Sequence, residues 1–285
     1  MSDLWRSGAQ RLDLAGFAVD TILVDAGDGA MTLRSFATLR DRMARDLPDH
    51  TVQVQECLAH PMGGGAARLM SQARHGVDGP FGQATHRPVQ YRIALDGQGD
   101  AGLTDLWQVR DRGGMLLCMG VDPAQWARHH PGKPVIKPEP AADQITDDWA
   151  RTQVDMLCTI MDGDLSAIHQ SYDPAVELWL PSGEVQTGPH AADLFWLSLR
   201  AALPTGDFVI ASATGQEDPL SAPRIAIRWY LTGTHDGWGR FGPPSGAKLC
   251  IMGMTHVEYG PRGVRREWTT IDDVAIWQQI YRKTG

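Results

Sequence analysis

The sequence predicts an α+β protein built from two tandem copies of one fold. In residues 146–285, helical patterns come first and four long strand patterns follow, which indicates a curved antiparallel sheet wrapped around helices. Residues 1–128 show a similar order, in which a helix ending at Leu-Pro, a Gly/Pro-rich turn and apolar strands recur. Residues 129–145 contain most of a proline-rich stretch that forbids a continuous helix. We therefore predict a reduced first copy, a linker and a complete second copy.

Composition and charge argue against several classes of protein. The net charge is -8, and the 26 Lys and Arg residues are scattered, which disfavours a nucleic-acid partner. No apolar run approaches the roughly 20 residues of a membrane helix, and "MSDLWRSGAQ" lacks the apolar core of a signal peptide. The four cysteines are far apart and show no Cys-x-x-Cys spacing, so we expect no metal site and no redox pair. These features are typical of a cytoplasmic protein without a membrane partner.

The elements of the second copy follow from local patterns. A helix is expected from a cap at Thr146 to a stop at Gly163, because apolar residues recur with helical spacing. A short helix from Asp164 and the strand "AVELWL" come next. Pro189 then begins a helix that ends at Leu203. The four strands are "DFVIASATG", "RIAIRWYLTGTH", "AKLCIMGMTHVEY" and "GVRREWTTID".

The two copies can be aligned through their closing segments, "VRDRGGMLLCMGVDPAQWAR" and "EYGPRGVRREWTTIDDVAIWQQ". In this alignment, Asp122 is the one polar residue that the first copy keeps at four positions compared with the second copy. The alignment matches Leu106, Leu117, Cys118 and Asp122 with His256, Glu267, Trp268 and Asp272, respectively. The first copy is therefore expected to serve as a scaffold.

Alternation along the strands predicts which side chains share the interior of the second copy. Three rows are expected to form one apolar chamber that also holds two histidines and one aspartate. They are Ile225, Ile227, Trp229, Leu231 and His235; Cys250, Met252, Met254 and His256; and Trp268, Thr270 and Asp272.

The stretch "RWYLTGTHDGWGRFGPPSGAKLCIMGMTHVEYGPRGVRREWTTIDDVAIWQQI" resembles the SnoaL-like polyketide cyclases, relatives of nuclear transport factor and ketosteroid isomerase. The resemblance is specific at the Gly-Thr-His hairpin, at "GMTH" and at "REWTTID"; residues 18–128 resemble the family more faintly. It implies two tandem cone-shaped half-barrels, each enclosing an apolar pocket. It also implies aldol-type ring closure without metal or organic cofactor, with an aspartate at the position of Asp272 as the acid/base.

A dry chamber suits proton abstraction next to a carbonyl, because loss of water raises the pKa of a carboxyl toward working pH. We expect Asp272 to act as the base, and His256 or His235 to stabilise the enolate oxygen. The expected partner is a small apolar molecule with a carbonyl group. Its binding residues would be Ile227, Trp229, Leu231, Met252, Met254, Trp268 and Thr270.

Structural alternatives exist for each of these residues. Asp272 could cap the terminal helix, His235 could hold a turn, and His256 could be a core histidine with satisfied hydrogen bonds. The methionines could be core filler. At the level of function, the alternatives are an epoxide hydrolase or dehydratase on the same fold, and a non-catalytic module that binds a small ligand. We also expect the two copies to pack sheet against sheet, with homodimerisation left open.

Overall fold

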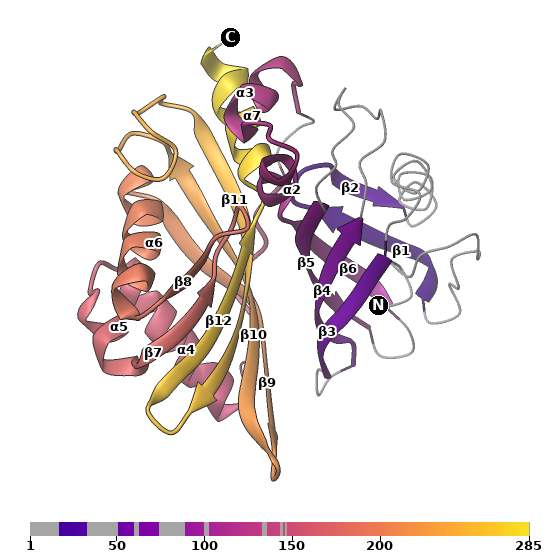
Figure 1. Cartoon of the computed structure of the whole chain (residues 1–285). Coiled ribbons are helices and arrows are strands. Elements are labelled where there is room, and N and C mark those ends of the chain that lie inside the picture. Colours follow the sequence, from indigo (N-terminus) through magenta and orange to yellow (C-terminus); the bar gives the residue numbers. More distant parts are fainter. Residues whose placement is uncertain are drawn as a thin grey trace.

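The computed structural model describes residues 17–32, 51–59, 63–73, 89–99, 103–132, 136–142, 145 and 147–284. Two six-stranded sheets dominate it, each with helices beside it (Figure 1). Their strand orders, β2-β1-β6-β5-β4-β3 and β8-β7-β12-β11-β10-β9, are equivalent. The α+β class and the tandem repeat are thus confirmed, as two open half-barrels. One detail differs from expectation: β1 with β6, and β7 with β12, pair in parallel, so the sheets are mixed.

The first repeat contributes six strands and two described helices. They are β1 (Phe17–Asp25), β2 (Gly29–Thr32), β3 (Thr51–Ala59), β4 (Gly65–Ala73), β5 (Val89–Gln98), β6 (Leu103–Arg110), α2 (Arg112–Cys118) and α3 (Pro123–His129). The helix predicted to end at Leu-Pro near residue 48 lies outside the described residues. The segment "MLLC", which the alignment treated as strand, is helical because Asp111 caps α2 through the N–H of Gly114.

The second repeat follows the sequence-based expectation closely. Its elements are α4 (Asp148–Met161), α5 (Ser166–Ser171), β7 (Tyr172–Trp179), β8 (Val185–Thr187), α6 (Pro189–Ala202), β9 (Asp207–Asp218), β10 (Ser221–Thr234), β11 (Lys248–Gly260), β12 (Gly263–Ile271) and α7 (Asp273–Thr284). The cap of α4 is Asp147, which accepts from the N–H of Ala150 at 2.7 Å. Thr146, the predicted cap, lies outside the described residues.

Strand register shows which residues of the two repeats are equivalent. Asp96 pairs with Trp107 in the first sheet, as His256 pairs with Trp268 in the second. Counting along β6 and β12 from these pairs matches Leu106 with Glu267 and Asp111 with Asp272. The predicted matches of Leu106, Leu117, Cys118 and Asp122 were therefore wrong, because β6 ends at Arg110, before the segment that was aligned as strand.

The interior of the second half-barrel is a core formed by one face of its sheet and by α4 and α6. Its fully buried members include Leu157, Trp196, Leu199, Ile225, Trp229, Leu231 and Ile271. In Figure 1, helices α5 and α6 lie on the side of this sheet that is turned away from the first repeat.

The opposite face of the second sheet meets the first sheet. Apolar side chains from both sheets form one cluster there, to which Ile136 of the linker segment also belongs: Ala94, Trp107, Val109, Tyr230, Cys250, Met252 and Met254. Arg228 crosses this boundary and donates to Asp96 at 2.8 Å. Strands β10 and β11 are therefore covered on both faces, and almost every residue of β11 is buried.

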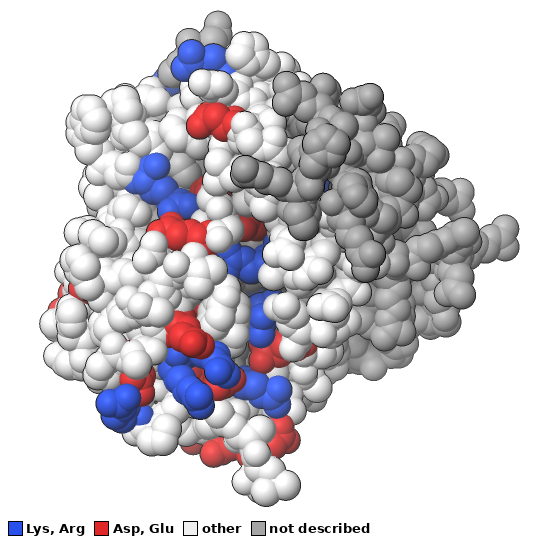
Figure 2. Space-filling model, in the orientation of Figure 1, with Lys and Arg blue, Asp and Glu red and all other residues white. Residues whose placement is uncertain are grey.

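Charged residues of both signs alternate on the displayed face of the molecule (Figure 2). Arg266 pairs with Glu177 and Glu258, at 3.0 and 3.2 Å, and Arg262 pairs with Asp173 at 2.9 Å. None of the helices within the described ranges is both long and apolar enough to cross a membrane.

Candidate functional site

Asp272 directly follows β12 and caps α7. Its Oδ1 accepts from the N–H of Ala275 at 3.1 Å, and its Oδ2 accepts from Nε of Arg112, in the first repeat, at 2.6 Å. Burial raises the pKa of Asp272 to about 6, although Arg112 works against this shift. Both carboxylate oxygens thus have partners, and the capping alternative describes what the structure shows at this position.

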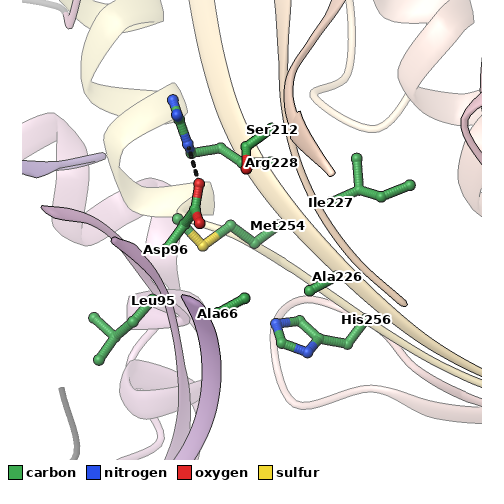
Figure 3. Close-up of a pocket in the computed structure, with 9 residues that line it drawn as sticks. All are labelled: Ala66, Leu95, Asp96, Ser212, Ala226, Ile227, Arg228, Met254 and His256. Carbon is green, nitrogen blue, oxygen red and sulfur yellow. Dashed lines mark hydrogen bonds and ion pairs between the residues drawn. The ribbon is translucent and has the colours of Figure 1, made fainter. Parts of the chain in front are cut away.

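His256 lies between the two sheets. Its Nδ1 is 2.8 Å from a carboxylate oxygen of Glu56, on β3 of the first repeat. Figure 3 shows it beside a small cavity that is also lined by Asp96, Arg228 and Met254. The cavity measures about 10 Å³, which is room for roughly one water molecule. His256 is therefore held against the first repeat rather than in the interior of the second.

His235 follows β10 and is fully buried. Its Nδ1 lies 3.0 Å from Oγ of Ser245, and its ring stands edge-on to Phe241. Burial lowers the pKa of His235. This contact fits the alternative in which His235 holds a turn. Asp272, His256 and His235, which were predicted to be catalytic, therefore lie in three separate parts of the structure.

The predicted chamber was wrong because it combined rows from opposite faces of the sheet. In an antiparallel pair, directly opposed residues share a face, and Trp229 opposes Gly253 while Val257 opposes Glu267. Ile227, Trp229 and Leu231 do face the interior. Met252, Met254, His256 and Trp268 face the first repeat. Thr270 is paired with Met254 across the two strands and therefore lies on the same face.

A polar centre that the sequence did not reveal occupies the interior face. Glu267 is 0% exposed, and its carboxylate accepts from the Tyr172 hydroxyl and, at 2.8 Å, from the Thr269 hydroxyl. Thr269 lies 3.0 Å from the Thr255 hydroxyl, which accepts from Nε1 of Trp229 at 3.0 Å. We call these five residues, from β7, β10, β11 and β12, the Glu267 network.

Burial raises the pKa of Glu267, because an apolar surrounding disfavours its charged form. Hydrogen bonds from Tyr172 and Thr269 act in the opposite direction and stabilise the carboxylate. Burial and the nearby charge of Glu267 also raise the pKa of Tyr259 to about 12. The centre thus combines a carboxyl that holds its proton to a higher pH than usual with donors that can support its ionised form.

Two further donors lie near this centre, the indole N–H of Trp196, on α6, and Nε2 of Gln153, on α4. The indole N–H of Trp196 faces Glu267 and Tyr172, and hydrogen bonding from it lowers the pKa of both groups. Oε1 of Gln153 accepts from Tyr259 at 2.8 Å, whereas its Nε2 is buried without a hydrogen-bond partner among the described residues. Buried donors without a partner are rare.

The first half-barrel has a different polar centre. Asp25 accepts two hydrogen bonds from Arg110, both at 2.9 Å, and one from Gln108. Burial opposes its charge, but Arg110, Gln108 and Arg112 together outweigh burial and lower the pKa of Asp25 to about 2. The position equivalent to Glu267 is Leu106. The polar centre of the first repeat is therefore an aspartate paired with arginine, whereas that of the second is a carboxyl with a raised pKa.

Alternation along "REWTTID" does place Glu267, Thr269 and Ile271 on one face, and this signal could have pointed to Glu267. The contribution of Tyr172 and Trp196 comes from distant segments and leaves no local pattern. Across the described part of the chain, His, Cys, Asp and Glu side chains nowhere form a group of three or more that could hold a metal ion.

Neither a protein-family model nor a curated protein matches this chain. Solved structures similar to it include a putative SnoaL-like polyketide cyclase from Jannaschia sp. CCS1, with 19% identity and a TM-score of 0.41, covering 48% of this chain and 97% of that chain. AclR, a putative hydroxylase from Streptomyces galilaeus, has 17% identity and a TM-score of 0.39, covering 46% of this chain and 80% of its own. TsrD from Streptomyces laurentii has 14% identity and a TM-score of 0.40, covering 48% and 98%. The solved structures that resemble this chain thus include SnoaL-like cyclases, each matching about half of it.

Proposed function

We propose that the second repeat is a cofactor-independent acid/base enzyme of the cyclase or isomerase type, acting on a small apolar carbonyl compound. Glu267 is the proposed acid/base. The observation that supports this role is a fully buried carboxyl with a raised pKa, hydrogen-bonded to Tyr172 and Thr269 on the interior face. The predicted cytoplasmic location accompanies this proposal as an expectation.

In the proposed reaction, ionised Glu267 takes a proton from the carbon next to the carbonyl, and the C–H electron pair moves into an enolate. The buried Nε2 of Gln153 would hydrogen-bond the enolate oxygen, and the indole N–H of Trp196 would stabilise the carboxylate of Glu267. Return of the proton to another carbon completes an isomerisation. Attack of the enolate carbon on a second carbonyl of the same molecule closes a ring, and the proton on Glu267 then neutralises the new alkoxide. Ile227, Trp229 and Leu231 would contact the apolar body of the substrate.

Asp272 is the second candidate base, because its pKa of about 6 is close to working pH. We rank it below Glu267 because an ion pair with Arg112 and a helix cap engage its two oxygens. A non-catalytic binding module is a second candidate function, favoured by the internal hydrogen bonds that already link the Glu267 network.

The test is deuterium uptake from D₂O into small apolar ketones, such as 2-tetralone and 1-indanone, followed by proton NMR. Wild-type protein should exchange the protons next to the carbonyl faster than buffer does. Glu267→Gln should lose roughly a hundredfold or more of that rate, the usual contribution of a positioned base. Asp272→Asn is the matched control, and it should retain most of the rate. Exchange no faster than in buffer would favour the binding module, and a larger loss in Asp272→Asn would transfer the role to that residue.

A further inference from the structure

A cleft of about 340 Å³ is lined by residues of both repeats. Its lining comes largely from α2, α3 and α7 and the residues next to them, and these helices lie close together where the repeats meet (Figure 1). The first repeat contributes Leu117, at the end of α2, and Asp122, which caps α3. The second repeat contributes Arg240 and Phe241 from the loop after β10, and Trp277 from α7. The volume falls in the range of small-molecule sites, roughly 300 to 1,000 Å³.

Apolar and polar side chains share the walls of the cleft. Leu117, one of its apolar lining residues, is 47% exposed. The rings of Phe241 and Trp277 stand edge to face, with centroids 5.8 Å apart. Phe241 is already buried, so a flat or ring-shaped apolar body would remove the exposed surface of Leu117 and of half-buried Trp277 from water.

The charges of the cleft are unbalanced. Arg240 donates twice to Asp273, at 3.2 and 2.9 Å, so these two charges neutralise each other. Asp122 accepts the N–H of Gln125 at 2.7 Å, and no Lys, Arg or His of the described ranges forms an ion pair with it. The lining thus holds two carboxylates against one guanidinium, and Asp122 carries the uncompensated charge.

We propose that this cleft binds a small primary amine carried on an aromatic or alicyclic body. The ammonium group would pair with the carboxylate of Asp122, and the ring would lie against Leu117 and Trp277. An ammonium group near aromatic rings also gains cation–π attraction. A carboxylate ligand fits less well, because it would meet Asp122 with like charge. This site is independent of the reaction proposed for Glu267.

The test compares three probes that share one ring: 2-phenylethylamine, 2-phenylethanol and 3-phenylpropanoate. Each is titrated into the full chain at neutral pH and low salt, and the dissociation constant is read from indole N–H shifts in NMR spectra. The amine should bind tightest, by roughly three- to tenfold over the alcohol, as one exposed ion pair with cation–π attraction would give. The carboxylate should bind weakest.

Two variants locate the site. Asp122→Asn keeps a good helix cap and removes the charge, so the amine should then bind no better than the alcohol. Leu117→Arg should weaken binding of the amine and the alcohol, because it removes an apolar wall and places a positive charge in the cleft beside Asp122. Leu220→Arg, at a fully exposed turn between β9 and β10, is the control with the same change of charge and should leave binding unchanged. Equal binding of the three probes, or amine binding that survives both Asp122→Asn and Leu117→Arg, overturns the proposal and leaves that for Glu267 untouched.

Discussion

Arg68 and Arg228 occupy equivalent positions in the two sheets, and each guanidinium lies 3.8 Å from the centre of a tryptophan ring of the opposite repeat. Arg68, on β4, lies over Trp268, while Arg228, on β10, lies over Trp107. The two repeats therefore meet through a pair of equivalent cation–π contacts related by an approximate twofold axis.

The carboxylate partners of these two arginines differ. Arg228 donates to Asp96 at 2.8 Å, and within the described part of the chain Asp96 pairs with no other cation. Arg68 is 3.8 Å from Glu56, which His256 also contacts. Loss of either arginine removes one cation–π contact. After loss of Arg68 the Glu56 carboxylate keeps its contact with Nδ1 of His256, whereas loss of Arg228 leaves the buried carboxylate of Asp96 without a cation among the described residues.

Arg228→Met should therefore destabilise the protein by about 3 to 5 kcal/mol, the usual cost of breaking a buried ion pair from one side. Arg68→Met should cost less, because His256 remains beside Glu56. Urea unfolding at neutral pH measures both values. Adding Asp96→Asn to Arg228→Met should restore part of the loss, and equal costs for the two single variants would contradict this account of the boundary.

Asp272→Asn should change how stability depends on pH. The pKa of Asp272 is raised from 3.8 to about 6 on folding, so the folded protein binds this proton more tightly than the unfolded chain does. Stability from this group is present at low pH and is lost as the pH rises through about 6. Asparagine caps the helix equally well and does not titrate. Relative to wild type, Asp272→Asn should thus gain up to roughly 3 kcal/mol between about pH 4 and pH 7.

Urea unfolding of both proteins across this range checks the prediction. Asp122→Asn provides the control, because it changes another aspartate that caps a helix but is exposed. A stability difference between Asp272→Asn and wild type that is constant with pH would show that the carboxyl of Asp272 titrates normally.

Much of the fold could be predicted from the sequence. Which face of each strand points to the interior could not. Apart from the short strand β8, which was not predicted, the order of helices and strands in the second repeat was correct, because capping residues, Pro189 and Leu-Pro ends mark the boundaries locally. Alternation identifies residues that share a face, but it selects the inner face only when the other face is polar. On β11 both faces are apolar, because the first repeat covers the side that carries Met252, Met254 and His256.

The same ambiguity about the inner face affected the prediction of the candidate site. Trp268, Thr270 and Asp272 formed the more conspicuous row, whereas Glu267 alternates with them on the opposite face. The pairing of Val257 with Glu267 and the hydrogen bond from Tyr172 show that Glu267 faces the interior. The partner of its carboxylate, Tyr172, lies 95 residues away, at a distance where sequence patterns give no information.

Tyr172→Phe should raise the pKa of Glu267 further, because the Tyr172 hydroxyl stabilises the charged form of this carboxyl. It should also destabilise the fold by about 1 to 3 kcal/mol, since a buried acceptor loses its donor. Tyr259→Phe is the matched control: its hydroxyl donates to Gln153 rather than to Glu267. A similar change in the pKa of Glu267 in both variants would contradict the assignment of Tyr172 as its specific donor.

The titration of the Glu267 carboxyl tests the central claim most directly and requires no substrate. The chain is labelled with ¹³C-glutamate, and the signal of Glu267 is identified by its loss in Glu267→Gln. We predict a titration midpoint above the ordinary value of 4.5, because the buried carboxyl resists ionisation. A midpoint at or below 4.5 would contradict the proposal that Glu267 is an acid/base held in a dry interior.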